Sequence, residues 1–193
     1  MPRRSRGARL NHFALVCALA CLGTGCGGTK RVELKDTAFA DFTRRVEEYV
    51  ALHRHVADSV GVLDETKSQT EIATRAALLA KGIIAARAQA RPGDIFTTEA
   101  ATRFTTIIRE EYRLRSPRVR DSREDAQEEL PDFEPHVNQV YPTAFPLATF
   151  PATLLPLLPS LPEDVEYRIV TRYLILRDVE ANVIIDLMPH AIP

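Results

Sequence analysis

Cysteine and glycine are scarce in this 193-residue chain, and neither lies where common enzyme chemistry needs it. All three cysteines fall within the first 26 residues, so the rest of the chain has no thiol for a disulfide framework, a metal site or a nucleophile. Five of the eight glycines lie at or before Gly28, which argues against a glycine-rich phosphate loop. The patterns of dinucleotide-binding turns, G-x-S-x-G nucleophile turns, H-E-x-x-H zinc sites and EF-hands are also absent. The sequence motifs therefore indicate no particular reaction for this chain.

The first 26 residues have the order of charge and hydrophobicity found in an export signal. Four arginines and no acidic residue precede an apolar run from Phe13 to Leu22, and small residues then lead to Cys26. A charged start, a short apolar segment and a small-residue cleavage zone are the three parts of such a signal. Ten apolar residues are too few to span a bilayer as a stable anchor. We therefore expect the chain to be exported.

The end of this segment resembles a bacterial lipoprotein signal. In that family a cysteine after the apolar run is lipidated and becomes the first mature residue, and Leu22-Gly23-Thr24-Gly25-Cys26 places small residues before Cys26. The chain departs from the family by having glycine, not leucine, three positions before that cysteine. The resemblance implies a membrane anchor at Cys26, and Gly27 after it implies sorting to the outer membrane.

Two other processing sites are possible. Cys21 is an alternative lipidation site, and Ala18-Leu19-Ala20 is a cleavage site that would release a soluble periplasmic or secreted protein.

Removal of the signal changes the net charge of the chain. Removing residues 1–25 takes away four arginines and no acids, so 25 basic and 26 acidic residues become 21 and 26, a net charge of −5. A mildly acidic mature chain argues against nucleic acid as a partner.

Two helices are predicted from apolar residues that recur at steps of three and four. The first begins near Phe39 and ends at Gly61, because glycine suits the position that caps a helix C-terminus. Ser68 and Glu71 have the spacing of a capping box that starts the second. The apolar seam of the second helix is Ile72, Ala76, Leu79, Ile83, Ala86 and Ala90. Its alanines allow a close approach, so we expect an antiparallel helical hairpin.

A third helix is predicted after the break at Arg91-Pro92-Gly93-Asp94. It starts near Thr97 or Thr98, and Ser116-Pro117 ends it. Its apolar face is Ala101, Phe104, Ile108 and Tyr112, with Ile107 beside it.

The second half changes composition twice before strands are predicted. Residues 131–162 hold eight of the thirteen prolines, yet large apolar side chains predict an ordered strap on the helices, with a helical turn around residues 152–158. Val165–Ile169 alternates apolar and charged residues, and Tyr173–Leu176 and Val183–Leu187 are rich in strand-forming residues. These three strands predict an antiparallel meander packed on the helices, which is an α+β fold.

The predicted domain organisation follows these changes in composition. The signal peptide is 1–25, a tether is 26–35, and one α+β domain is 36–193. Within that domain we expect a helical part at 36–117, a charged loop at 118–130, the proline-rich strap at 131–162 and the meander at 163–193.

A cluster of arginines is the candidate anion-binding site. No acid lies between Tyr112 and Arg120, and guanidinium groups suit phosphate and carboxylate. In a cell envelope such groups belong to anionic lipids and acidic glycans. The alternative is an exposed loop, because acidic residues from Asp121 onwards nearly cancel the positive charge. The cluster is Arg113, Arg115, Arg118, Arg120 and Arg123.

The histidines predict no metal or catalytic site. His53 and His55 point about 200° apart on a helix, so they cannot hold one ion together. His53 lies in the apolar seam, where we expect a core histidine bonded to a neighbour. His136 and His190 are separated along the chain, and Asp186 is expected to face outward from a one-sided sheet.

These observations favour an exported cell-envelope lipoprotein whose domain is a non-enzymatic binding or scaffolding module. Its expected partners are the membrane, through the lipid anchor, and an envelope protein, an anionic lipid or a glycan. No cofactor is expected. One alternative is an exported enzyme that gathers scattered histidines and carboxylates, and a second is a periplasmic metal-binding protein.

Overall fold

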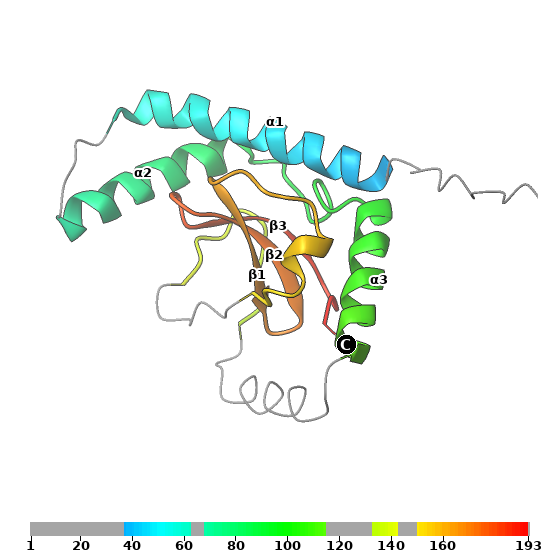
Figure 1. The fold of residues 1–193 in the computed structure, drawn as a ribbon. Coiled ribbons are helices and arrows are strands. Elements are labelled where there is room, and N and C mark those ends of the chain that lie inside the picture. The colour runs from blue at the N-terminus through cyan, green and yellow to red at the C-terminus, as the bar shows by residue number, and fades with distance from the viewer. Residues whose placement is uncertain (1–36, 63–67, 115–132, 143–149, 193) are drawn as a thin grey trace, which may run out of the picture. The chain divides into compact units, whose positions relative to one another are not determined.

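The computed structural model describes residues 37–62, 68–114, 133–142 and 150–192, which belong to one compact unit, Leu34–Pro193. Three helices precede three antiparallel strands, which confirms the predicted α+β fold (Figure 1). The elements are α1 (Thr37–Val60), α2 (Gln69–Ala86), α3 (Thr98–Leu114), the short 3₁₀ helix η1 (Leu155–Leu157), β1 (Val165–Val170), β2 (Tyr173–Asp178) and β3 (Val183–Met188).

The helix ends follow from their sequence signals. Gly61 has a φ of +90° and its N–H bonds the carbonyl of Ala57, so it closes α1 as predicted. The Ser68 hydroxyl accepts the N–H of Glu71 at 3.3 Å, which confirms Ser68 as the N-cap of α2. The α2 helix ends at Ala86, whereas the predicted seam continued to Ala90.

The α1 and α2 helices run in opposite directions, as predicted for the hairpin (Figure 1). The buried face of α2 is Leu79, Ala80 and Ile83, which confirms the middle of the predicted seam. Ile72 is 43% exposed and Ala86 is also exposed, so the prediction is wrong at these two positions. Gly82 rather than an alanine permits the closest approach, because a Cβ atom at this position would overlap Cγ1 of Val56 on α1.

The sheet has the order β1-β2-β3, and Thr171 and Asn182 take positive φ angles in its two turns. Residues 138–141 pair with the outer edge of β3, where the Asn138 N–H bonds the Ile184 carbonyl at 2.8 Å. All six residues of β3 are buried. The strand is covered on both faces because a second apolar cluster lies opposite the helices. That cluster contains Tyr141, Val170, Ile175, Ile184 and Leu187.

Aromatic rings join the helices to the sheet and the strap. Phe104 of α3 lies 5.0 Å from Phe42 of α1 and 5.8 Å from Tyr167 of β1, measured between ring centroids. Phe150 packs on the same tyrosine at 5.6 Å, which holds the strap against the sheet. The predicted helical turn in the strap is present as η1, although Leu155 and Leu157 are about half exposed rather than buried.

Candidate functional site

The candidate residues chosen from the sequence lie mostly outside the part of the chain that the structure describes. Arg113 is exposed in the last turn of α3, where a positive charge suits the negative end of the helix dipole. Arg115, Arg118, Arg120 and Arg123 lie outside the described residues, and so do Cys21 and Cys26. The arginine cluster therefore stays a prediction.

His53 is buried, and its Nδ1 atom lies 2.6 Å from Oδ2 of Asp178 at the end of β2. The same carboxyl oxygen accepts the Tyr49 hydroxyl at 2.6 Å, and the other accepts the Ala181 N–H at 2.7 Å. The hydrogen bond that His53 donates to Asp178 is the largest influence on the histidine and raises its pKa, although burial opposes the rise. The arrangement therefore favours a charged imidazolium, and the prediction of a core histidine bonded to a neighbour is confirmed.

The second nitrogen of His53 also faces carboxylates. Its Nε2 lies 3.5 Å from Oε2 of Glu180 and 4.0 Å from Oδ1 of Asp164. A catalytic histidine needs this nitrogen directed at a nucleophile or a substrate proton, whereas here it points to two acids and the ring is only 2% exposed. The network connects α1 to the ends of β1 and β2, so it stabilises the fold.

The other histidines are not gathered into this network. His55, His136 and His190 are all exposed. Among the residues in the four described ranges, no group of three histidine, aspartate, glutamate or cysteine side chains is arranged to hold a metal ion.

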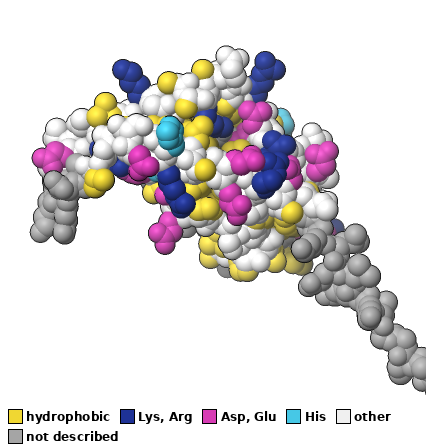
Figure 2. Space-filling view, turned by 90° about the horizontal axis from the view of Figure 1, so that it is seen from above, with side chains coloured by type: hydrophobic (Ala, Val, Ile, Leu, Met, Phe, Trp, Pro, Cys, Tyr) yellow, Lys and Arg dark blue, Asp and Glu magenta, His cyan; other side chains and the backbone are white. Residues whose placement is uncertain are grey.

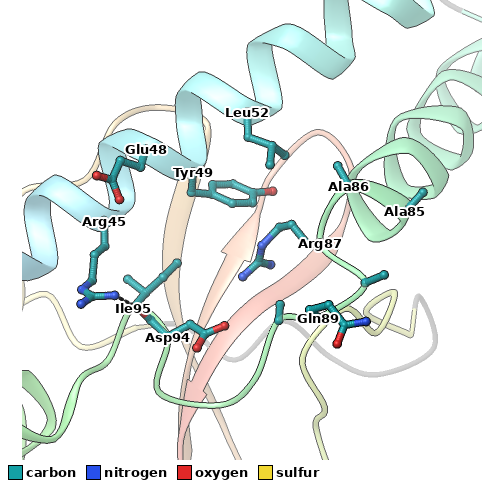
Figure 3. Close-up of a pocket in the computed structure, with 12 residues that line it drawn as sticks. Arg45, Glu48, Tyr49, Leu52, Ala85, Ala86, Arg87, Gln89, Asp94 and Ile95 are labelled. Atoms are coloured by element: carbon teal, nitrogen blue, oxygen red, sulfur yellow. Dashed lines mark hydrogen bonds between the residues drawn. The ribbon is translucent and has the colours of Figure 1, made fainter.

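A cleft that Tyr49 helps to line lies between α1 and the segment that leaves α2 (Figure 3). Its volume of about 580 Å³ is enough for a small molecule. Helix α1 contributes three residues with polar groups to its lining, and the α2 end and the following turn contribute several alanines. The lining is Arg45, Glu48, Tyr49, Leu52, Ala85, Ala86, Arg87, Ala88, Gln89, Ala90, Asp94 and Ile95.

Arg87 is a charged side chain of this cleft that several neighbouring groups hold in place. One guanidinium nitrogen donates to the Ile185 carbonyl at 2.8 Å and another to Oδ1 of Asn138 at 3.3 Å. The amide of Asn138 donates in return to the Arg87 carbonyl at 2.7 Å. The guanidinium carbon lies 5.1 Å from the centre of the Tyr49 ring, a cation–π distance. Arg87 therefore joins the end of α2 to β3 and keeps a fixed orientation.

Asp186 of β3 fixes the opposite wall of the cleft. It is fully buried, so the prediction that it faces outward is wrong. Its carboxylate accepts main-chain N–H groups from Gly93, Ile95 and Phe96 at 2.7–2.9 Å, and burial raises its pKa although these bonds oppose the rise. The turn before α3 needs such an acceptor because its N–H groups lie in the interior.

Arg45 and two acids complete the polar lining. Arg45 bonds Oδ2 of Asp41 at 2.7 Å and the Asp94 carbonyl at 2.8 Å, so it connects α1 to the turn (Figure 3). Glu48 is exposed and pairs with Arg44 on the same helix. Figure 2 shows acidic and basic side chains intermixed on the face seen from above, so that face carries no broad field of one sign.

Sequence reasoning missed the residues that organise this site. Tyr49 and His53 were one helical turn apart, which indicated a shared face, but nothing local connected them to Asp178. Arg87 follows a run of apolar residues at the end of a helix, and a long cation there indicates a contact with carbonyl groups.

Comparison with protein-family models, curated proteins and solved structures finds no match to this chain. No described helix combines the length and hydrophobicity required to cross a membrane.

Proposed function

We propose that this chain is an exported cell-envelope lipoprotein, anchored through Cys26, whose α+β domain binds a small ligand without catalysing its conversion. The anchor rests on the first 26 residues, with their positive start, short apolar run and small residues before the cysteine. Helix α1 begins at Thr37, eleven residues after Cys26. An extended chain of that length reaches about 40 Å at most, so the domain would stay close to the membrane surface.

The cleft beside Tyr49 is the observation that carries the binding part of the proposal. Its Arg87 side chain is held in one orientation by main-chain and amide groups, and a ligand need not order it on binding. His53, which is bonded to Asp178, directs its second nitrogen at Glu180 and Asp164 instead of at this cleft. A fixed polar wall without a directed proton donor or nucleophile is typical of recognition.

The anchor is tested by expressing the full chain in a bacterium that modifies lipoproteins. We expect the intact mass of the mature protein to show a lipid-modified Cys26 and the protein to sediment with membranes. The C26S variant should lose both properties, whereas C21S should keep them. A free N-terminus at Cys21, or loss of the lipid only in C21S, would contradict the proposal.

The binding part is tested on the mature protein purified in detergent. Small molecules released by denaturation are identified by mass spectrometry, added back and incubated with fresh protein. Recovery of the same compound unchanged, together with a higher melting temperature, is the expected result. Conversion of the compound into a product would show that the domain is an enzyme.

A further inference from the structure

We infer that Arg87 is the anion-recognition point of the cleft, and that the ligand is a small molecule with one carboxylate or phosphate group placed against this guanidinium. This inference rests on the binding function proposed above and gives its ligand a chemical class.

The charge of Arg87 has no acidic partner in contact with it. Arg44, Arg45, Arg75, Arg168 and Arg177 each have a carboxylate oxygen within hydrogen-bonding distance. No ion pair joins Arg87 to any carboxylate of the described residues, and Asp94 and Asp186 act on it only from a longer distance. Burial lowers the pKa of Arg87, which is the effect of removing a cation from water without a counter-ion in contact. A bound anion would supply that counter-ion.

The guanidinium also has hydrogen-bond donors left for a ligand. It carries five N–H groups, of which one bonds the Ile185 carbonyl and one bonds the Asn138 amide oxygen. Figure 3 shows the group projecting from the α2 end into the space beneath Tyr49. Because carboxylate and phosphate accept two parallel N–H bonds, they match the remaining donors better than a neutral carbonyl does.

The rest of the lining limits the size and charge of the ligand. Two cations, Arg45 and Arg87, face two acids, Glu48 and Asp94, so the charges of the lining sum to zero. A polyanion such as a nucleic acid or a multiply phosphorylated lipid would meet repulsion from the acids. Leu52, Ile95 and the alanines offer contact to an apolar body. A single anionic group on a small, partly apolar molecule fits these features.

Two probes and a pair of matched variants test the inference. Acetate and inorganic phosphate are titrated into the ¹⁵N-labelled mature protein in detergent at constant pH and ionic strength, with chloride as the reference salt. We expect saturable shifts of the Arg87 Nε–H signal and of the amides of residues 88–90. Saturation by phosphate alone identifies a phosphate site, and saturation by acetate identifies a carboxylate site.

The variants place a competing carboxylate inside or outside the cleft. Ala86 and Gln89 are exposed residues of the lining. The new carboxylate of A86E or Q89E should form an ion pair with Arg87 and so weaken probe binding at least about tenfold. Ala77 is exposed on the same helix but does not line this cleft, so A77E should bind as the unmodified protein does. Melting curves confirm that each variant is folded.

The inference is overturned if neither probe saturates, or if A86E and Q89E bind as tightly as A77E. That outcome would leave the lipid anchor intact, because the mass of the N-terminus tests it separately. It would also leave a co-purified neutral ligand possible, so failure of this inference is distinguishable from failure of the proposed function.

Discussion

At the scale of single residues, the neighbours of a side chain decide its chemistry more than its type does. His53 is an imidazole with carboxylates near both ring nitrogens, and its bond to Asp178 attaches α1 to the sheet. Arg87 is a surface type of residue held against carbonyl groups and an aromatic ring. The sequence predicted that His53 would be in the core, but not which acids would surround it.

The His53 network predicts a stability that falls as the pH rises. The pKa of His53 is higher in the folded protein than its ordinary value, so the folded state binds the proton more tightly. This contribution is fully present below about pH 6.5, the ordinary pKa of histidine, and is lost as the pH rises through the folded pKa. Urea denaturation of the mature protein between pH 5 and pH 9 should show the decline.

The variant H53Q should lose that decline and about 3 kcal/mol of stability at low pH, because it leaves the buried Asp178 without its cation. H55Q is the matched control, since His55 is exposed two residues away on the same helix. Equal pH dependence in H53Q and H55Q would show that another group causes the decline.

At the scale of elements, a buried hydrogen-bond acceptor and a glycine at a helix contact determine how neighbouring elements pack. The buried Asp186 carboxylate bonds the turn between α2 and α3, and α1 and α2 pack closely where Gly82 has no Cβ atom. Both features join segments that are far apart in sequence. Local patterns predicted the elements, whereas these contacts needed the assembled structure.

Replacing Asp186 by asparagine should loosen the turn before α3. An amide has one acceptor oxygen where the carboxylate has two, so N–H groups of Gly93, Ile95 or Phe96 lose their partner inside the protein. We expect a loss of about 3 kcal/mol in urea denaturation and faster amide exchange at these three residues. The exposed E99Q variant serves as the control. Unchanged exchange in D186N would contradict the assigned role.

At Gly82 the test adds a side chain instead of removing a hydrogen-bond acceptor. Alanine favours a helix over glycine by about 1 kcal/mol, so G82A would stabilise an isolated helix. Here the added Cβ atom overlaps Val56, and we expect a net destabilisation of about 1–2 kcal/mol. The double variant G82A/V56A removes the overlap and should show a favourable coupling of the two changes in a denaturation cycle. Strict additivity would mean that the helices do not meet at this point.

At the scale of the whole molecule, the sequence predicted the order of helices and strands but not the contacts that form the candidate site. Periodicity and caps predicted three helices and three strands because those signals are local in the chain. The contacts that build the site join residues far apart, such as His53 with Asp178 and Gly93 with Asp186, so no spacing rule reports them. The error at Asp186 has the same origin. Alternation placed Asp186 outward, but the pairing of β2 with β3 shifts register at Leu176/Arg177, and Asp186 lies opposite Leu176 of the main core, where it bonds the turn before α3.

The position of Tyr49 also limits how the cleft can diversify. Its hydroxyl belongs to the buried network and its ring faces Arg87, so one side chain would serve both stability and the proposed ligand binding. A change at Tyr49 or Arg87 that altered the ligand would also detach α1 or α2 from the sheet. Ala85, Ala86 and Gln89 line the same cleft from exposed positions. Evolution or engineering of a new specificity would therefore change these small and exposed residues and leave Tyr49 and Arg87 unchanged.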